Sequence, residues 1–266
     1  MQLANSIKIN DTLLYVGTSG YNHEDWKGTF APVDIHNYDL LTYYADQGIS
    51  FLEIAFTFYR IPEADKIQHI INRTGDRVKF SVRLPKALVR NPWDEEAYEG
   101  FRKGIAPLTS KGLLECLYAD YHPYFSASKK NKELITALRG RFSEIRFFAE
   151  LSNRTWYKER IFDYFRECNV GMTVIDMPLI KGVAPYYPIN LNYALYFKLY
   201  GRSHLWMTAE EKFLNYSYSD SEIKRFLQNA AERSVTADVI YLVFANVAEG
   251  FAPKNALRTQ QLAKEL

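Results

Sequence analysis

Eight short apolar runs recur along the chain, and each of them leads to a polar or charged residue. The runs are rich in β-branched and aromatic side chains, which is typical of buried strands. They span residues 13–19, 51–55, 78–83, 115–120, 145–150, 172–176, 195–202 and 239–246. Their polar ends are 22 to 48 residues apart, which is enough for a strand and a returning helix. The repeat predicts an α/β fold, a TIM-like (β/α)8 barrel, with residues 1–266 as one domain.

The segments between the runs show the 3.6-residue periodicity of amphipathic helices, with one exception. We predict helices over 39–47, 63–72, 94–105, 132–138, 158–168, 221–231 and 255–266. The exception is 177–192, between the sixth and seventh runs, which contains three prolines and a glycine. Proline interrupts a helix because it lacks the backbone N–H. We therefore expect this connection to be irregular and the outer ring to have seven regular helices.

Bulk properties narrow the class of protein only slightly. The length of 266 residues suits one barrel of this kind. The formal charge of +2 argues neither for nor against a polyanionic partner. The two cysteines match neither a disulfide framework nor a zinc motif. The first residues do not resemble a signal peptide, and no apolar run approaches the roughly 20 residues of a membrane span. A cytoplasmic protein without membrane association is the expectation, and the oligomeric state stays open.

The polar residues at the strand ends are the candidate active-site residues, because active sites of these barrels form at the carboxyl ends of the strands. Glu53, Glu150 and Asp176 come from different strands, so they could converge as a general acid and base. The same three carboxylates could instead be oxygen ligands for Mg²⁺ or Mn²⁺. Four further strand-end residues of both charges are candidates for binding an anionic substrate: Arg83, Asp120, Lys198 and Arg202. A network of salt bridges that only stabilises the barrel is the simpler alternative.

Histidine is scarce at the predicted mouth. None of the five histidines belongs to a strand-end run, so a His-rich zinc cluster is not expected. His23, His122 and His204 lie in predicted loops, where each is a candidate for a lone acid or base.

Several segments resemble the YecE-like barrel proteins, the family called domain of unknown function 72. The matching pieces include GTSGYNHEDWKGTFAP (17–32), FLEIAFTFYRIP (51–62), AELSNRTW (149–156), KLYGR (198–202) and VFANVAEGFAPKNA (243–256). They occur in family order from the first run to the last, which implies the same barrel fold. The resemblance adds Thr18, Tyr59, Trp156 and Asn246 to the candidate substrate-binding residues. It implies no reaction.

The chain departs from the family pattern near the predicted mouth, which makes it a divergent member. Arg83 stands where relatives usually have Lys, and Asp120 where they have Gln. Where the family has a Glu-x-Arg-His segment, this chain has Glu150-Leu-Ser-Asn153. This last change removes an arginine and a histidine from the predicted mouth.

Three functions remain open on the sequence alone, and the sequence does not decide whether the chain is an enzyme. The first is a hydrolase or isomerase with a mixed-charge site at the barrel mouth. Its substrate would be a small anionic molecule that is phosphorylated, sugar-like or nucleotide-like. The second is a non-catalytic module that binds nucleic acid or another polyanion through Arg83, Lys86, Arg90, Trp93, Lys129 and Lys130. The third is a degenerate family member without activity.

Overall fold

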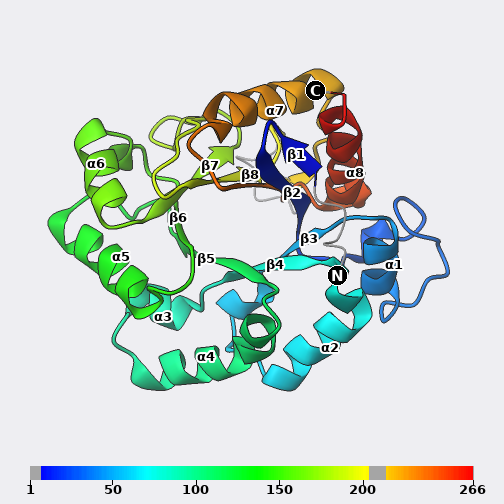
Figure 1. Cartoon of the computed structure of the whole chain (residues 1–266), viewed down its shortest axis with the longest axis horizontal. Coiled ribbons are helices and arrows are strands. Elements are labelled where there is room, and N and C mark those ends of the chain that lie inside the picture. The colour runs from blue at the N-terminus through cyan, green and yellow to red at the C-terminus, as the bar shows by residue number, and fades with distance from the viewer. Residues whose placement is uncertain (1–6, 204–213, 266) are drawn as a thin grey trace.

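The computed structural model describes residues 7–203 and 214–265, and its centre is a closed ring of parallel strands (Figure 1). The ring consists of β2 (Thr12–Ser19), β3 (Phe51–Ile54), β4 (Lys79–Arg83), β5 (Leu114–Tyr121), β6 (Phe147–Leu151), β7 (Gly171–Asp176), β8 (Ala194–Leu199) and β9 (Val239–Phe244). Each strand pairs with the next along the chain, and β9 pairs with β2 to close the ring. The predicted (β/α)8 barrel is confirmed.

Helices surround the barrel. They are α1 (Leu40–Asp46), α2 (Ala64–Thr74), α3 (Lys86–Arg90), α4 (Glu95–Ser110), α5 (Lys129–Arg141), α6 (Glu159–Glu167), α7 (Asp220–Ser234) and α8 (Phe251–Ala263). All seven predicted helices are present. The segment 177–193 contains no helix, as its prolines predict, and Figure 1 shows it as loops between α6 and α7. The short helix α3 was not predicted, because five residues after a proline carry too little periodicity.

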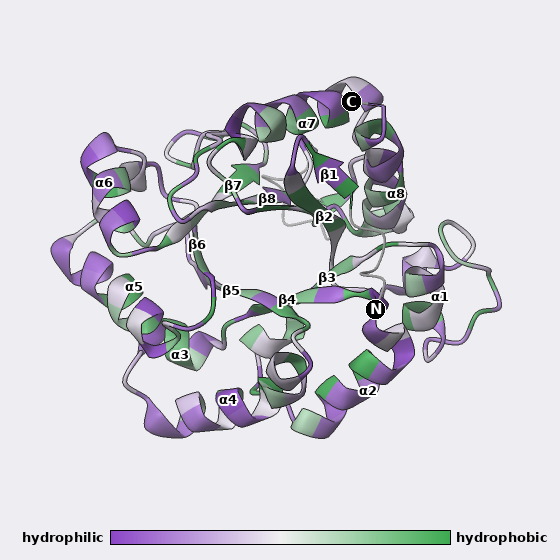
Figure 2. Cartoon of the chain, viewed as in Figure 1, coloured by the Kyte–Doolittle hydropathy of each residue, from purple (hydrophilic) through white to green (hydrophobic). Residues whose placement is uncertain are grey.

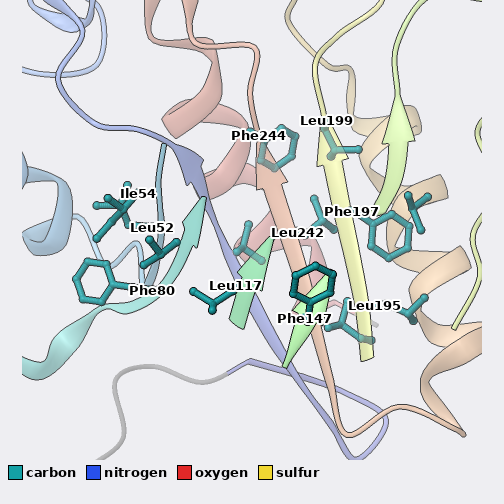
Figure 3. Packing of buried hydrophobic residues seen from close by; sticks show 14 of the residues in the cluster. Leu52, Ile54, Phe80, Leu117, Phe147, Leu195, Phe197, Leu199, Leu242 and Phe244 are labelled. Carbon is teal, nitrogen blue, oxygen red and sulfur yellow. The ribbon is translucent and has the colours of Figure 1, made fainter. Parts of the chain in front are cut away.

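The core has two layers because alternate residues of a strand face opposite sides of the sheet. Outward-facing side chains pack under the helices, and Figure 3 shows part of this cluster, with Leu52, Phe197 and Phe244 among its members. Hydrophilic residues cover long stretches of the outer helices, α4 and α6 among them (Figure 2). The inward-facing layer is mostly aromatic and consists of Tyr15, Phe51, Tyr118, Phe148, Tyr196 and Tyr241, with small and aliphatic neighbours. This packed layer closes the interior of the barrel below its carboxyl end.

Gly17 allows β2 and β3 to approach each other closely. A Cβ atom at this position would lie 1.8 Å from the carbonyl oxygen of Phe51. The packing of these two strands therefore requires glycine at position 17, the first residue of the GTSG segment. An additional strand, β1 (Ile7–Ile9), pairs antiparallel with the start of β2.

Candidate functional site

A polar layer lies on the inner face of the barrel, directly above the aromatic layer. Glu53, Asp120, Glu150 and Lys198 each follow an inward-facing aromatic residue by two positions, so their side chains face inward as well. Ser19 joins them from β2, because its hydroxyl donates a hydrogen bond to Glu53. The structure thus brings together two of the three predicted catalytic carboxylates, Glu53 and Glu150.

Both carboxylate oxygens of Glu53 accept hydrogen bonds from other residues of the barrel interior. Its Oε1 accepts hydrogen bonds from Lys198 Nζ, from the Ser19 hydroxyl and, at 2.9 Å, from the Tyr118 hydroxyl. Its Oε2 accepts one from the Tyr196 hydroxyl at 2.5 Å. Both members of the ion pair are buried, with side-chain exposures of 0% for Glu53 and 2% for Lys198.

Glu53 stays ionised in this setting. Burial alone would raise the pKa of Glu53, but the Lys198 charge and the surrounding donors hold that pKa below its ordinary value. Because both carboxylate oxygens are occupied, Glu53 serves as a fixed negative charge that anchors Lys198.

Glu150 differs from Glu53 in having an unoccupied oxygen. Its Oε1 accepts a hydrogen bond from the Tyr200 hydroxyl, whereas its Oε2 is buried and has no hydrogen-bond partner among the described residues. Burial and the neighbouring Asp120 raise the pKa of Glu150 to about 7, although Lys198 and Tyr200 oppose the shift. Asp120 and Glu150 are register partners on β5 and β6, which places two carboxyl groups side by side. The raised pKa keeps most of Glu150 protonated below a pH of about 7.

The titration of Glu150 predicts how stability depends on pH. The pKa of Glu150 is raised in the folded protein, so the folded state binds this proton more tightly than the unfolded state does. Its contribution to stability is present below the ordinary pKa of 4.5 and is lost as pH rises through about 7. Glu150→Gln removes this loss. As the pH rises through that window, the free energy of unfolding of the variant should increase relative to that of the wild type by on the order of 3 kcal/mol.

Urea unfolding of both proteins at a series of pH values measures the effect. Glu53, Asp120, Lys198 and Arg83 also face this region, so the quantity to follow is the difference between variant and wild type. A difference that does not change with pH would show that Glu150 titrates normally.

Arg83 is the cation at the end of β4. It forms an ion pair with Asp120 and stacks on Phe58, with 3.8 Å from the guanidinium carbon to the ring centre. Burial alone would lower the pKa of Arg83, but Tyr118, Asp120, Tyr200 and Glu150 raise it, so the group stays charged. Its Nε is buried without a hydrogen-bond partner among the described residues. The guanidinium therefore has an unused donor for a bound acceptor.

A cleft of about 490 Å³ opens beside this ion pair. It is lined by Phe58, Arg83, Lys86, Val89, Arg90, Asp120, Tyr121, His122, Pro123, Phe125 and Leu134. Lys86 and Arg90, from α3, are exposed at its rim. With Arg83 they outnumber Asp120, so the charged side chains that line the cleft carry a net positive charge. Arg83, which the polyanion alternative also uses, is paired with Asp120.

Asp176 does not join the other two carboxylates, which corrects the predicted catalytic set. It pairs in register with Leu199, which packs in the outer core, whereas its neighbour Ile175 pairs with the inward-facing Lys198. Asp176 therefore faces the helices. There it binds Arg202, at 2.6 Å from Nη2, and accepts a hydrogen bond from the Tyr218 hydroxyl at 2.7 Å.

The Arg202 guanidinium donates hydrogen bonds to Asp176 and, at 3.4 Å, to Glu222. Asp176 and Arg202 together hold the segment after β8 against the start of α7.

Three residues suggested by the family resemblance lie outside the barrel interior, where they make hydrogen bonds to neighbouring elements. Thr18 packs under α1, where its backbone N–H and its hydroxyl both lie 3.1 Å from the Tyr44 hydroxyl. Trp156 is fully buried and donates from Nε1 to the Phe125 carbonyl at 2.6 Å. Asn246 donates to the Tyr216 carbonyl at 2.7 Å and to Asn255.

Tyr59 is the fourth residue from the resemblance, and it is 82% exposed beside Phe58. Its side chain does not line the cleft.

The described residues do not assemble the expected oxygen-ligand set for Mg²⁺ or Mn²⁺. Across 7–203 and 214–265, no three His, Cys, Asp or Glu side chains lie close enough together to hold a metal ion. Glu53 is occupied by Lys198, and Asp176 lies on the opposite face of the sheet. The carboxylates that are present therefore fit proton transfer better than that ligand set.

A larger hollow, of about 900 Å³, lies at the opposite end of the barrel. Four of its charged residues form two ion pairs, Arg102–Glu144 at 2.7 Å and Arg146–Asp238 at 3.4 Å. The amino ends of the strands in this fold contribute mainly to stability. We therefore place the candidate site at the smaller cleft.

Sequence reasoning missed the tyrosines that organise the polar layer. Tyr118, Tyr196 and Tyr200 donate hydrogen bonds to the carboxylates, yet in the sequence they look like ordinary strand aromatics. Of the loop histidines, His122 lines the cleft and His23 packs against Trp26. Burial lowers the pKa of His23. His204 lies outside the described residues.

Comparison with known proteins gives one family and several structures. The model of a family described as "Protein of unknown function DUF72" matches residues 15–266. A DUF72 family protein from Thermotoga maritima is 29% identical with a TM-score of 0.86, covering 94% of this chain and 99% of its own. A DUF72 family protein from Enterococcus faecalis is 20% identical with a TM-score of 0.83, covering 94% of this chain and 95% of its own.

More distant structures share the fold alone. An endo-1,4-beta-mannanase from Eisenia fetida is 8% identical with a TM-score of 0.52, covering 96% of this chain and 94% of its own. No curated protein matched the sequence. None of the helices in the described part of the chain has the length and apolar character needed to cross a membrane.

Proposed function

The chain belongs to the DUF72 family, and on that premise we propose that it is an enzyme that moves a proton on a small anionic substrate at the carboxyl end of the barrel. The carboxyl pair Asp120–Glu150 is the acid/base unit, and Arg83 binds the anion with help from Lys86 and Arg90. The observation that carries the proposal is the unpartnered, buried oxygen of Glu150 beside Asp120. Buried polar atoms without partners are rare in folded proteins and call for an explanation such as catalysis.

The Arg83–Asp120 ion pair couples substrate binding to proton transfer. An anion bound at the free Nε of Arg83 adds a second negative charge to the guanidinium that Asp120 binds through Nη2. Asp120 then loses part of its stabilisation as a carboxylate, and its affinity for a proton rises. Asp120 lines the cleft, so it presents the proton or the free carboxylate to the substrate, while Glu150 holds the shared proton behind it. Hydrolysis or isomerisation of a phosphorylated or sugar-like anion fits such a unit.

A turnover screen with phosphate monoesters, sugar phosphates and nucleotides tests the proposal. For any substrate found, we expect Arg83→Met to raise KM by about tenfold or more, since a charge-assisted contact is lost. Arg83→Lys, which keeps the charge, should recover part of the loss. Arg102→Met, on the outer surface, is the matched control. A substrate whose KM is unchanged by Arg83→Met would contradict the assignment of Arg83 to anion binding.

A further inference from the structure

The cleft has a charged end and an apolar end, and the two ends belong to different parts of the fold. The charged end is formed by Arg83 and Asp120, which face the barrel interior, with Lys86 and Arg90 on the rim. The apolar end extends outward between α3 and α5, where Val89 and Leu134 line it. A substrate that filled the cleft would therefore need both an anionic and an apolar part.

Aromatic side chains form the wall between these two ends. Phe58 lies against the Arg83 guanidinium, and Phe125 stacks on Tyr121 with ring centres 4.4 Å apart. Both Phe58 and Phe125 line the cleft and are partly exposed. Flat faces of this kind favour an aromatic or other planar group in the ligand.

Each end of the cleft also carries a buried polar atom without a partner among the described residues. These atoms are Nε of Arg83 at the charged end and the hydroxyl of Tyr121 at the apolar end. Tyr121 is only 3% exposed, so water reaches its hydroxyl poorly. A buried donor left unpaired costs about 1–3 kcal/mol, and a ligand that accepts from it recovers that cost. The anion of a ligand can accept from Arg83, whereas the Tyr121 hydroxyl is satisfied only if the apolar part of the ligand also carries an acceptor.

We infer that the substrate of this site is an amphipathic anion, with a phosphate or carboxylate at Arg83 and an aromatic group packed between α3 and α5. The inference rests on the proposed function and specifies its substrate class. A volume of about 490 Å³ is within the range of small-molecule sites. Sugar phosphates would leave the outer half of such a cleft without apolar contact.

Calorimetric titration of the full chain with four probes tests the inference: inorganic phosphate, phenyl phosphate, phenylacetate and phenol. We expect phenyl phosphate to bind about ten- to a hundredfold more tightly than inorganic phosphate, because burial of an aromatic ring adds to the anion contact. Phenylacetate should bind more tightly than phenol, which lacks the anion.

Two variants locate the aromatic contribution. Leu134→Trp fills the apolar end, and Leu134→Glu places a charge there; each should abolish the gain of phenyl phosphate over phosphate. Both should leave the affinity for inorganic phosphate within about twofold of the wild type. Leu257→Trp, a half-buried leucine on α8, is the matched control and should change neither affinity.

The outcomes separate this inference from the proposed function. If inorganic phosphate binds but phenyl phosphate binds no better, the inference is overturned and the anion site stands. A gain that survives both Leu134 variants, or a phenol affinity equal to that of phenylacetate, also overturns it. If none of the three anions binds, the proposed function fails together with the inference.

Discussion

Replacing Lys198 with methionine is expected to destabilise the barrel by about 3–5 kcal/mol, because it leaves the Glu53 carboxylate buried without its cation. Glu53 has no exposure to solvent, so water cannot replace the lost partner. The hydroxyls of Ser19, Tyr118 and Tyr196 would remain as donors, but none of them carries a compensating charge. Urea unfolding at neutral pH measures the loss as a lower free energy of unfolding.

The double variant Glu53→Gln/Lys198→Met distinguishes loss of the pair from loss of packing. Because both charges are removed, it should recover most of the stability that Lys198→Met loses. Lys111→Met, which removes an exposed lysine 3.8 Å from Asp76, is the control and should change stability by less than about 0.5 kcal/mol. If Lys198→Met cost no more than Lys111→Met, the buried pair would not stabilise the barrel.

Glu150→Gln is expected to lower kcat by about 10²–10⁴, the usual contribution of a positioned acid or base. Glutamine keeps the size of the side chain and can still accept from Tyr200, but it cannot exchange a proton with Asp120. KM should change little, since Glu150 does not line the anion cleft. The wild-type rate should also change as pH passes about 7, where Glu150 titrates, and the variant should lack this dependence.

Glu115→Gln provides the matched control for that experiment. Glu115 lies on β5, as Asp120 does, but at the opposite end of the barrel, where it is 3.5 Å from Lys79. Its substitution should leave kcat unchanged. Equal turnover by wild type and Glu150→Gln on the same substrate would rule out Glu150 as part of the acid/base unit.

The strands and most helices of this barrel could be predicted because their signals are local. Eight apolar runs at regular spacing give the ring, and the prolines of 177–192 give its irregular connection. β1 escaped prediction because three residues, Ile7–Ile9, give too short a pattern. Its hairpin turn contains Asn10 at φ 53°, a conformation that asparagine tolerates.

The candidate site could be predicted only in part, because the face on which a strand residue lies depends on register. A shift of one position moves a side chain from the barrel interior to the helix side. Buried parallel strands are apolar on both faces, so the pattern around Asp176 does not reveal that it points outward whereas Glu150 points inward. The cleft itself was not predictable, since it arises from α3 and α5 packing beside the ends of β4 and β5.

The proposed function depends on Glu150 keeping its proton up to a pH of about 7, and infrared difference titration measures this protonation most directly. Spectra of the wild type minus those of Glu150→Gln isolate the signal of the protonated carboxyl at this position. Half of this signal should disappear at a pH of about 7, because burial and Asp120 raise the pKa of Glu150. A carboxyl already fully ionised at a pH of about 5.5, near the ordinary behaviour of glutamate, would contradict it.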